Sequence, residues 1–261
     1  MIRALSTAAT GMEAQQTRLD VTANNIANVS TSGFKKSRAE FADLLYQTVT
    51  APGAATGADT ASPTGIQVGM GVKTLATQRM HSVGEFRQTG NPLDIAIEGR
   101  GFLPINLPSG GVGYTRSGAL KLDSEGRLVN SEGYALASDI TLPPDAQSVA
   151  IASDGTVSVT IPGESAPVQA GQIEVAAFAN PAGLEAMGRN MFRETGASGT
   201  ATLGAPGTNG TGTLSQGSLE MSNVKIVEEM VDLISGQRAY EIITRVVRSA
   251  DEMLQQTASI R

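Results

Sequence analysis

The most regular hydrophobic pattern lies at the N-terminus. Apolar residues recur there at alternating spacings of three and four, and only Gln16 is polar in the series. This spacing predicts a helix of the coiled-coil type. Its seam comprises Ile2, Leu5, Ala9, Met12, Gln16, Leu19, Ala23 and Ile26. We expect the helix to end within residues 24–33, where asparagines and Gly33 accept left-handed backbone angles.

The C-terminal forty residues repeat the helical pattern. Ser222 and Asn223 form a plausible cap, and the periodicity then runs almost to Arg261. A shift of register, with a possible bend at Gly236, separates two seams. The first holds Val224, Val227, Val231 and Ile234, the second Ile243, Val246, Ala250, Met253, Thr257 and Ile260, and a neighbouring stripe holds Ile226, Met230, Leu233, Tyr240, Val247 and Leu254. This apolar face is wider than one partner helix covers.

The middle of the chain has the short alternation of β-strands. Residues 93–98 alternate, and the turn sequence 123–126 separates two short apolar runs. Asp154 and Gly155 precede another run, and residues 173–178 form a further candidate strand. Short strands with turns every 8–12 residues indicate a sandwich or barrel-like β-domain rather than βαβ units.

Two stretches of low complexity, 51–65 and 195–217, are typical of loops or extended arms. If residues 34–217 formed one globule, it would measure about 40 Å across. A helix over 223–260 would be about 57 Å long and the N-terminal helix about 38 Å. Because the C-terminal helix would be longer than both the globule and the N-terminal helix, part of its apolar face would stay uncovered within one chain. We expect that part to contact other chains. An ordinary intramolecular helix hairpin that caps the β-domain is the alternative.

Composition excludes several kinds of site. The chain has no cysteine, so disulfides, thiolate metal sites and cysteine nucleophiles are absent, and His81 is its one histidine. The net charge of −6 does not suit a nucleic-acid surface. No apolar run reaches the length of a membrane span, and no leader-like apolar segment follows Arg3. We therefore expect no nucleic acid, no membrane insertion and no cleaved signal peptide.

Motifs of catalysis are weak. Glycines at 69–71 and 99–101 lack the rest of a dinucleotide-binding loop. His81 is more typical of a surface or packing residue than of a base or ligand. Carboxylates at Asp94, Glu98, Asp123 and Glu125 offer glycosidase chemistry in principle, but nothing brings two together. The sequence predicts no enzyme, no cofactor and no metal.

Several motifs resemble the bacterial flagellar rod and hook proteins. They run in the family's order over the whole chain, at residues 23–35, 90–102, 114–118, 126–129, 216–224 and 237–241. Signature positions are Asn24, Asn25, Asn28, Gly33, Gln237, Arg238 and Tyr240. The length, and an insertion between Leu45 and Gly69, resemble the distal rod member most closely.

The resemblance implies an α+β fold. Terminal helices, in a discontinuous domain of residues 1–33 and 218–261, would pair as an antiparallel coiled coil. Residues 34–92 would link the domains and carry an extended β arm near 46–68. Residues 93–217 would form a mainly-β outer domain. The assembly interface would include Leu5, Met12, Leu19, Ile26, Val227, Val231, Ile234, Ile243, Val246 and Met253.

The resemblance also implies a function. Subunits would polymerise helically into the hollow distal rod, the drive shaft that spans the periplasm and transmits torque from motor to hook. Expected partners are further copies of the chain, proximal rod proteins, hook protein, the P and L rings as bushing, the rod cap and the type III export apparatus. A proximal rod or other axial subunit of the family, and a secreted β-rich enzyme or adhesin, stay open as alternatives.

Overall fold

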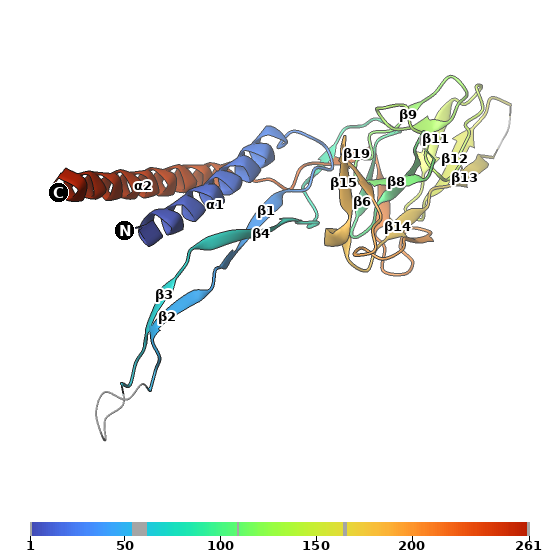
Figure 1. The fold of residues 1–261 in the computed structure, drawn as a ribbon. Coiled ribbons are helices and arrows are strands. Elements are labelled where there is room, and N and C mark those ends of the chain that lie inside the picture. The colour runs from blue at the N-terminus through green and yellow to red at the C-terminus, as the bar shows by residue number, and fades with distance from the viewer. Residues whose placement is uncertain (1, 54–61, 109, 164–165, 260–261) are drawn as a thin grey trace. The chain divides into compact units, whose positions relative to one another are not determined.

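The computed structural model describes residues 2–53, 62–108, 110–163 and 166–259. The expected arm at 51–65 and the seam residue Ile260 therefore fall partly or wholly outside the described residues. The chain divides into two compact units. The first comprises residues 1–27, 37–78 and 225–261, and the second residues 28–36 and 79–224. Fold class is α+β, with helices at the two ends and a mainly-β middle (Figure 1).

Two long helices dominate the first unit. They are α1 (Ile2–Ala27) and α2 (Ile226–Ser259), with lengths of about 39 Å and 51 Å. The helix ends agree with the pattern, except that Asn223 does not cap α2. Its side-chain oxygen accepts a hydrogen bond from the Lys36 backbone N–H instead (2.7 Å), and α2 begins three residues later.

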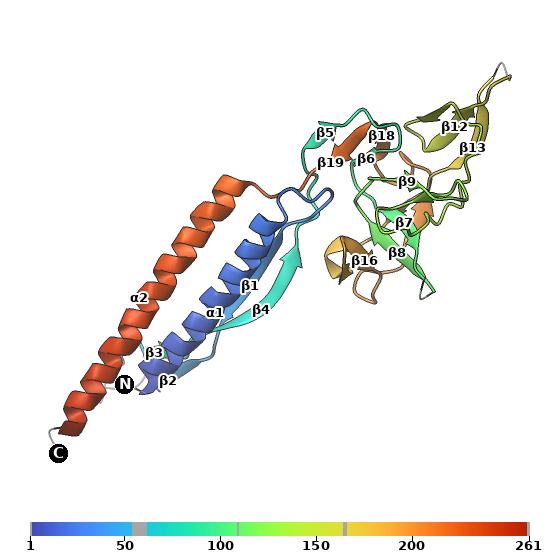
Figure 2. The ribbon, with the colours of Figure 1, turned by 90° about the horizontal axis from the view of Figure 1, so that it is seen from above.

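The two helices lie side by side (Figures 1 and 2). Asn25, near the end of α1, donates to Glu229 at the start of α2 (3.0 Å), and Arg18 pairs with Asp232 (2.8 Å). Further back along α1, Met12 accepts a hydrogen bond from Thr244 (4.0 Å). The contacts thus run in opposite directions along the two helices.

The buried face of α2 follows one continuous register. Apart from Thr244, its buried or half-buried residues are spaced by three or four positions: Glu229, Leu233, Gly236, Ala239, Ile243, Val247, Ala250 and Leu254. The predicted register shift is therefore wrong. Three inward residues, Leu233, Val247 and Leu254, come from the predicted neighbouring stripe, and two, Ile243 and Ala250, come from the second predicted seam. Glu229 and Gly236 complete the register without being hydrophobic, so the apolar pattern did not include them.

The predicted seam of α1 is correct at every second position. Leu5, Met12, Leu19 and Ile26 are half-buried, whereas Ala9, Gln16 and Ala23 are exposed. The most buried residues are Ala14, Thr22 and Asn25. Because α1 packs against the strand β1 (Ser37–Asp43) as well as against α2, its buried face differs from the one expected for a single partner helix.

The first unit also contains four strands. They are β1 (Ser37–Asp43), β2 (Tyr46–Thr50), β3 (Ile66–Gly69) and β4 (Val72–Arg79). β1 pairs with β4, and β2 pairs antiparallel with β3 in a two-stranded ribbon. Figure 1 shows this ribbon running away from the helices. The backbone N–H of Val72, the first residue of β4, donates to the Thr10 hydroxyl (3.4 Å) and so joins β4 to α1.

The second unit is built from small sheets of two to four strands among its described residues. The four-stranded sheet has the order β15-β16-β8-β7, and a three-stranded sheet has the order β11-β12-β13. The strands are β5 (Phe86–Gln88), β6 (Ile95–Glu98), β7 (Leu103–Asn106), β8 (Val112–Thr115), β9 (Lys121–Leu122), β10 (Leu128–Val129), β11 (Ser148–Ile151), β12 (Thr156–Thr160), β13 (Val168–Gln172), β14 (Val175–Ala177), β15 (Glu185–Gly188), β16 (Met191–Arg193), β17 (Thr202–Gly204), β18 (Thr213–Gln216) and β19 (Ser218–Glu220).

Two apolar clusters fill the second unit. The larger is aliphatic, with Ile97, Leu103, Val157 and Ile173 nearly inaccessible to solvent. The smaller is aromatic and contains Phe102, Tyr114, Phe178 and Phe192. Predicted strands at 93–98 and after Asp154 are confirmed, as is the turn at 123–126 between β9 and β10. The strand predicted at 173–178 is shorter and spans β14 alone.

No helix in the described part of the chain combines the length and apolar character that a membrane crossing requires.

Candidate assembly surfaces

Asn25 connects three segments of the first unit. It is 2% exposed at the end of α1. Its amide donates to the Ser37 carbonyl (2.9 Å) and to Glu229 (3.0 Å), and its oxygen accepts from the Ser37 N–H (2.9 Å). A carboxamide has both a donor and an acceptor, so it can pair with both backbone groups of one residue. This signature residue therefore joins α1, β1 and α2.

Gly33 is a signature residue of the second unit. It has a φ of +69°, a left-handed value that favours glycine. A Cβ atom there would lie 2.7 Å from the Ser117 backbone nitrogen, while the Gly33 N–H donates to the Glu220 carbonyl (2.8 Å). Gly33 thus permits a close backbone approach.

The remaining signature residues occupy less enclosed positions. Asn28 is half-buried, and Asn24, Gln237, Arg238 and Tyr240 are exposed. Gln237, Arg238 and Tyr240 lie on α2, so they are available for contacts outside the subunit.

A buried cluster of three charges lies in the second unit. The Glu220 carboxylate, 1% exposed, accepts from Lys35 Nζ (2.6 Å), from Arg116 Nε and from the Gly84 N–H (2.8 Å). Lys35 also donates to the Ser82 carbonyl (2.6 Å). The Arg116 guanidinium donates to three further carbonyls, those of Gly101, Ile97 and Gly99.

The opposite charges in this cluster counteract the effect of burial on the pKa values of Glu220 and Lys35. Burial alone would raise the pKa of Glu220, but Arg116, Lys35 and the Gly84 N–H hold that pKa below its ordinary value. Burial lowers the pKa of Lys35, and the Glu220 charge opposes that shift. Because Lys35 precedes β1 and Glu220 ends β19, the cluster joins segments 185 residues apart.

His81 packs beside the charged cluster. Its ring makes edge contacts with Phe102 and Phe192 at centroid distances of 5.4 and 5.5 Å. Burial, and then the positive charges of Lys35, Arg79 and Arg116, lower the His81 pKa to about 4, against an opposing backbone hydrogen bond at Pro181. The imidazole is therefore neutral near pH 7. Its ring contacts make it a packing residue, one of the two roles, surface or packing, that the sequence predicted.

The predicted interface residues fall into two groups. Leu5, Met12, Leu19, Ile26 and Ile243 are half-buried within the helix pair. The other five are exposed on α2: Val227 (75%), Val231 (59%), Ile234 (46%), Val246 (50%) and Met253 (51%). Val227, Val231 and Ile234, spaced by four and three, form what we call the α2 outer stripe. An uncovered aliphatic row of this kind is typical of a contact with another chain.

The ribbon carries a second exposed apolar surface. Its residues are Tyr46, Val49, Ile66 and Val68, and Leu45 (87%), which directly precedes β2, adds to it. Edge strands with exposed apolar side chains are open to association unless something covers them. Both exposed surfaces belong to the first unit.

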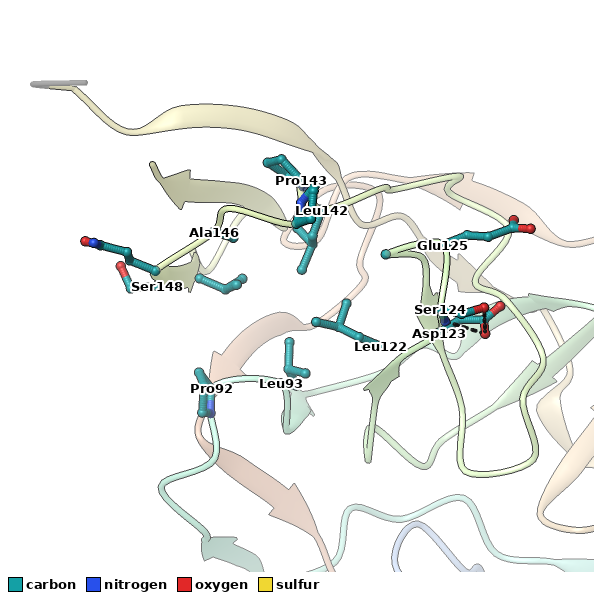
Figure 3. A pocket seen from close by; sticks show the side chains of 14 residues that line it. Pro92, Leu93, Leu122, Asp123, Ser124, Glu125, Leu142, Pro143, Ala146 and Ser148 are labelled. Atoms are coloured by element: carbon teal, nitrogen blue, oxygen red, sulfur yellow. Dashed lines mark hydrogen bonds between the residues drawn. The ribbon is translucent and has the colours of Figure 1, made fainter. Parts of the chain in front are cut away.

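The second unit contains an apolar pocket of about 530 Å³ (Figure 3). Its lining includes Leu93, Leu122 and Leu142, with prolines at 92, 143 and 144. Asp123 and Glu125 lie at one side, and both pair with Arg127, at 3.0 and 3.2 Å. Hydrogen bonds from the Ser124 N–H and Arg127 lower the pKa of Asp123. An ionised, paired carboxylate does not suit a general acid.

Metal chemistry has no evident site in the part of the chain that the structure describes. There, no three or more His, Cys, Asp or Glu side chains gather in a group that could hold an ion. Asp94, another carboxylate considered from the sequence, accepts hydrogen bonds from Thr89 (2.6 Å) and Asn91 (3.0 Å). Those bonds give it a structural role in the turn before β6.

Comparison with known proteins accounts for these features. Family models match residues 5–35 (flagella basal body rod protein), 96–159 (flagellar hook protein FlgE/F/G D1 domain) and 215–260 (flagellar basal body rod FlgEFG protein C-terminal). The flagellar basal-body rod protein FlgG of Borreliella burgdorferi is 50% identical over 97% of both chains. The chain belongs to the FlgG family of flagellar rod proteins. FlgG of Caulobacter vibrioides is 48% identical and FlgG of Buchnera aphidicola subsp. Schizaphis graminum 44% identical, each over 100% of both chains.

Membership of the FlgG family establishes the general role. The chain is a structural subunit of the distal rod in the flagellar basal body, and it is not an enzyme. The predicted family is confirmed, and the enzyme alternative is excluded. The charged cluster was not predicted as such. Lys35, Arg116 and Glu220 each stand within a family motif. Lys35 follows Phe34, and Glu220 lies between Leu219 and Met221, so an apolar neighbour was an available signal for the burial of these two. Arg116 lies between Thr115 and Ser117 and had no such signal.

Proposed function

We propose that this FlgG-family subunit polymerises helically into a hollow shaft that transmits torque from the motor to the hook. The observation that carries the proposal is the α2 outer stripe, three aliphatic side chains exposed on a helix whose other face is already packed on α1. Burial of such side chains between subunits is the main favourable term in assembly.

In this proposal the terminal helices pair as an antiparallel coiled coil that lines the channel. The order of the contacts supports it, since Asn25, Arg18 and Met12 meet Glu229, Asp232 and Thr244 in reversed sequence. The register of α2, with inward residues at three- and four-residue steps, also supports it. Residues 1–33 with 218–261 act as this inner domain, and residues 93–217 act as the outer one.

The β2–β3 ribbon and the connection between its strands form the arm that reaches neighbouring subunits. Exposed Tyr46, Val49 and Ile66 give the ribbon an apolar surface for that contact. Deletion of residues 51–64, of which 54–61 lie outside the described residues, should leave folding and export intact and give a more bendable rod. Electron microscopy measures the bending, and an unchanged curvature distribution contradicts this role.

The wider setting follows from a rod that crosses the periplasm. The proximal rod and the hook adjoin its two ends, the P and L rings surround it, and the rod cap and the type III export apparatus deliver and place its subunits. We infer export without a cleaved signal peptide, which agrees with the polar residues Gln15, Gln16 and Arg18 inside α1.

Ile234→Asp tests polymerisation. Ile234 is 46% exposed, so the monomer should fold, but a carboxylate buried between subunits without a partner is costly. We expect normal circular dichroism of the monomer and no rods in basal-body preparations. Leu203→Asp, at a similarly exposed position on β17, is the control for the added charge. Leu19→Asp should also prevent assembly, through disruption of the helix pair itself. Normal rods from Ile234→Asp would contradict an axial contact on α2.

A further inference from the structure

The first unit contains an apolar groove of about 610 Å³. It lies between the first turns of α1, β3 and the second half of α2. Its lining consists of Arg3, Ala4, Thr7, Ala8, Gly11, Val68, Gly69, Ile243 and Val246. We call this hollow the small-residue groove.

Small side chains on α1 create the groove. Ala4, Ala8 and Gly11 follow one another at steps of four and three, so they share one face of the helix. A Cβ atom on Gly11 would lie 3.5 Å from Ile243 Cδ1, which places Gly11 in the floor. The groove therefore has the shape to accept larger aliphatic side chains from outside.

The α2 outer stripe has the complementary form. Val227, Val231 and Ile234 project from a single helix face as a row of branched side chains, without a partner in the described part of the subunit. They are larger than the residues of the groove. A row of aliphatic side chains against a row of small ones is the arrangement in which two helical surfaces interdigitate.

Charge at the edges is compatible with the same pairing. Glu228 and Asp232 flank the stripe, where they already pair with Lys225 (3.0 Å) and Arg18 (2.8 Å) of their own subunit, and their side chains are 54% and 53% exposed. The groove has Arg3 in its lining, and Arg3 donates to the Gln47 side chain (2.6 Å). Because a carboxylate accepts several hydrogen bonds, the exposed oxygens beside the stripe can accept a further one from Arg3 of the neighbouring copy, which orients two copies.

The two surfaces lie at different places along α2. Val231 and the groove residues Ile243 and Val246 are 12 to 15 residues apart, or about 20 Å along the helix. A contact between them joins unlike surfaces of two copies and leaves one of each free. Such a heterologous contact continues into an open helical assembly instead of closing as a dimer.

We propose that the α2 outer stripe of one subunit seats in the small-residue groove of the next. This inference rests on the proposed polymerisation and specifies which surfaces meet. Val246 extends the groove onto the exposed flank of α2, so the apolar contact continues beyond the hollow. A row of three side chains is well below the ~1,200 Å² typical of a stable isolated complex, so the contact forms effectively only when a growing rod offers other contacts at the same time.

Cysteine cross-linking tests the pairing, because the chain has no cysteine of its own. Cells would carry two chains together, one with Ala4→Cys and one with Val231→Cys, and isolated basal bodies would be oxidised. We expect a disulfide-linked dimer from this mixture and none from either variant alone. A cross-link between Ala4→Cys and Tyr46→Cys in place of it would assign the groove to the ribbon and overturn the proposal. Rods that form without the Ala4–Val231 cross-link overturn this pairing alone, whereas a chain that builds no rod overturns polymerisation itself.

A charge exchange provides an independent test. Ala4→Lys and Val231→Glu each place an unpaired charge in the contact, and both positions are exposed in the monomer. Each single variant should reduce the number of rods at least tenfold, and the double variant should recover most of them. Ala4→Lys combined with Val231→Lys is the matched control and should not recover. An equal reduction in the number of rods in both double variants would overturn the pairing.

Discussion

Glu220→Gln should strongly destabilise the second unit. Glu220 is the single negative charge against two positive ones, Lys35 and Arg116, and all three side chains are at most 4% exposed. The cluster as it stands has a net charge of about +1. Loss of the carboxylate raises it to about +2, while the two cations stay buried. Removal of one partner from a buried ion pair costs about 3–5 kcal/mol.

Lys35→Met is the informative comparison. It leaves the Arg116–Glu220 pair intact and reduces the net charge of the cluster from about +1 to zero. We therefore expect Glu220→Gln to lower the free energy of unfolding by about 4 kcal/mol, and Lys35→Met by less than half of that. Glu185→Gln is a control for the chemical change, because Glu185 pairs with Arg193 on the surface (2.7 Å) and should change stability by less than about 1 kcal/mol.

Urea denaturation of the full-length monomer, followed by circular dichroism, gives these free energies. The thermal midpoint of Glu220→Gln should fall by about 10 °C. Since the pKa of Glu220 is depressed in the folded state, its contribution is present above the unfolded pKa and is lost as the pH falls through the folded value. The difference between wild type and Glu220→Gln should therefore shrink in strong acid. If Lys35→Met lowers the free energy of unfolding as much as Glu220→Gln does, the argument from the net charge of the cluster is wrong.

The remaining predictions concern His81, Gly236 and Asn25. The His81 pKa is lowered from 6.5 to about 4, so between pH 4 and 6.5 the unfolded state binds more protons than the folded state. The free energy of unfolding should therefore fall by up to about 3 kcal/mol as the pH drops from 6.5 to 4. His81→Phe should flatten that part of the pH profile in urea titrations, and an unchanged slope relative to wild type would assign it to other groups. Gly236→Leu should destabilise the helix pair by about 1–3 kcal/mol, because even a Cβ atom there would lie 2.9 Å from Leu19 Cδ2. The loss of helical circular dichroism on heating measures this destabilisation, and Ser235→Leu, at the neighbouring exposed position, is the control. Asn25→Ala should lower the free energy of unfolding, measured by urea denaturation, by about 3 kcal/mol, because it removes the hydrogen bonds to Ser37 and Glu229. Asn24→Ala, at the adjacent exposed position, should lower it by less than half of that amount. Equal effects at 24 and 25 would show that the buried hydrogen bonds of Asn25 are not the cause.

The helices were the most predictable part of the fold. Periodicity gave both elements and their ends to within a few residues, because long amphipathic helices repeat their signal many times. It did not give the register of α2. Glu229 and Gly236 occupy inward positions for reasons that a hydrophobic pattern does not contain: one accepts a hydrogen bond from Asn25, and the other allows close approach to Leu19.

The packing of α1 against β1 was also hidden from the sequence. The predicted seam assumed one partner helix, so Ala9, Gln16 and Ala23 were assigned to the buried face that Ala14, Thr22 and Asn25 in fact occupy. In the β-rich unit, turn sequences such as 123–126 identified local hairpins correctly. Pairings between distant segments, such as β6 with β18, depend on tertiary contacts that no local pattern encodes.

The charged cluster has a consequence for the order in which the chain folds. Lys35 and Glu220 are separated by 185 residues, so their contact closes a loop that contains nearly the whole β-rich unit. Closure of so long a loop is entropically costly, and proteins dominated by such distant contacts fold slowly. Lys35 and Arg116 remain hydrated until Glu220 arrives, since burial of either cation alone is unfavourable. A nascent or translocating chain therefore cannot complete this unit early, and its last β-strand determines when the native state becomes accessible.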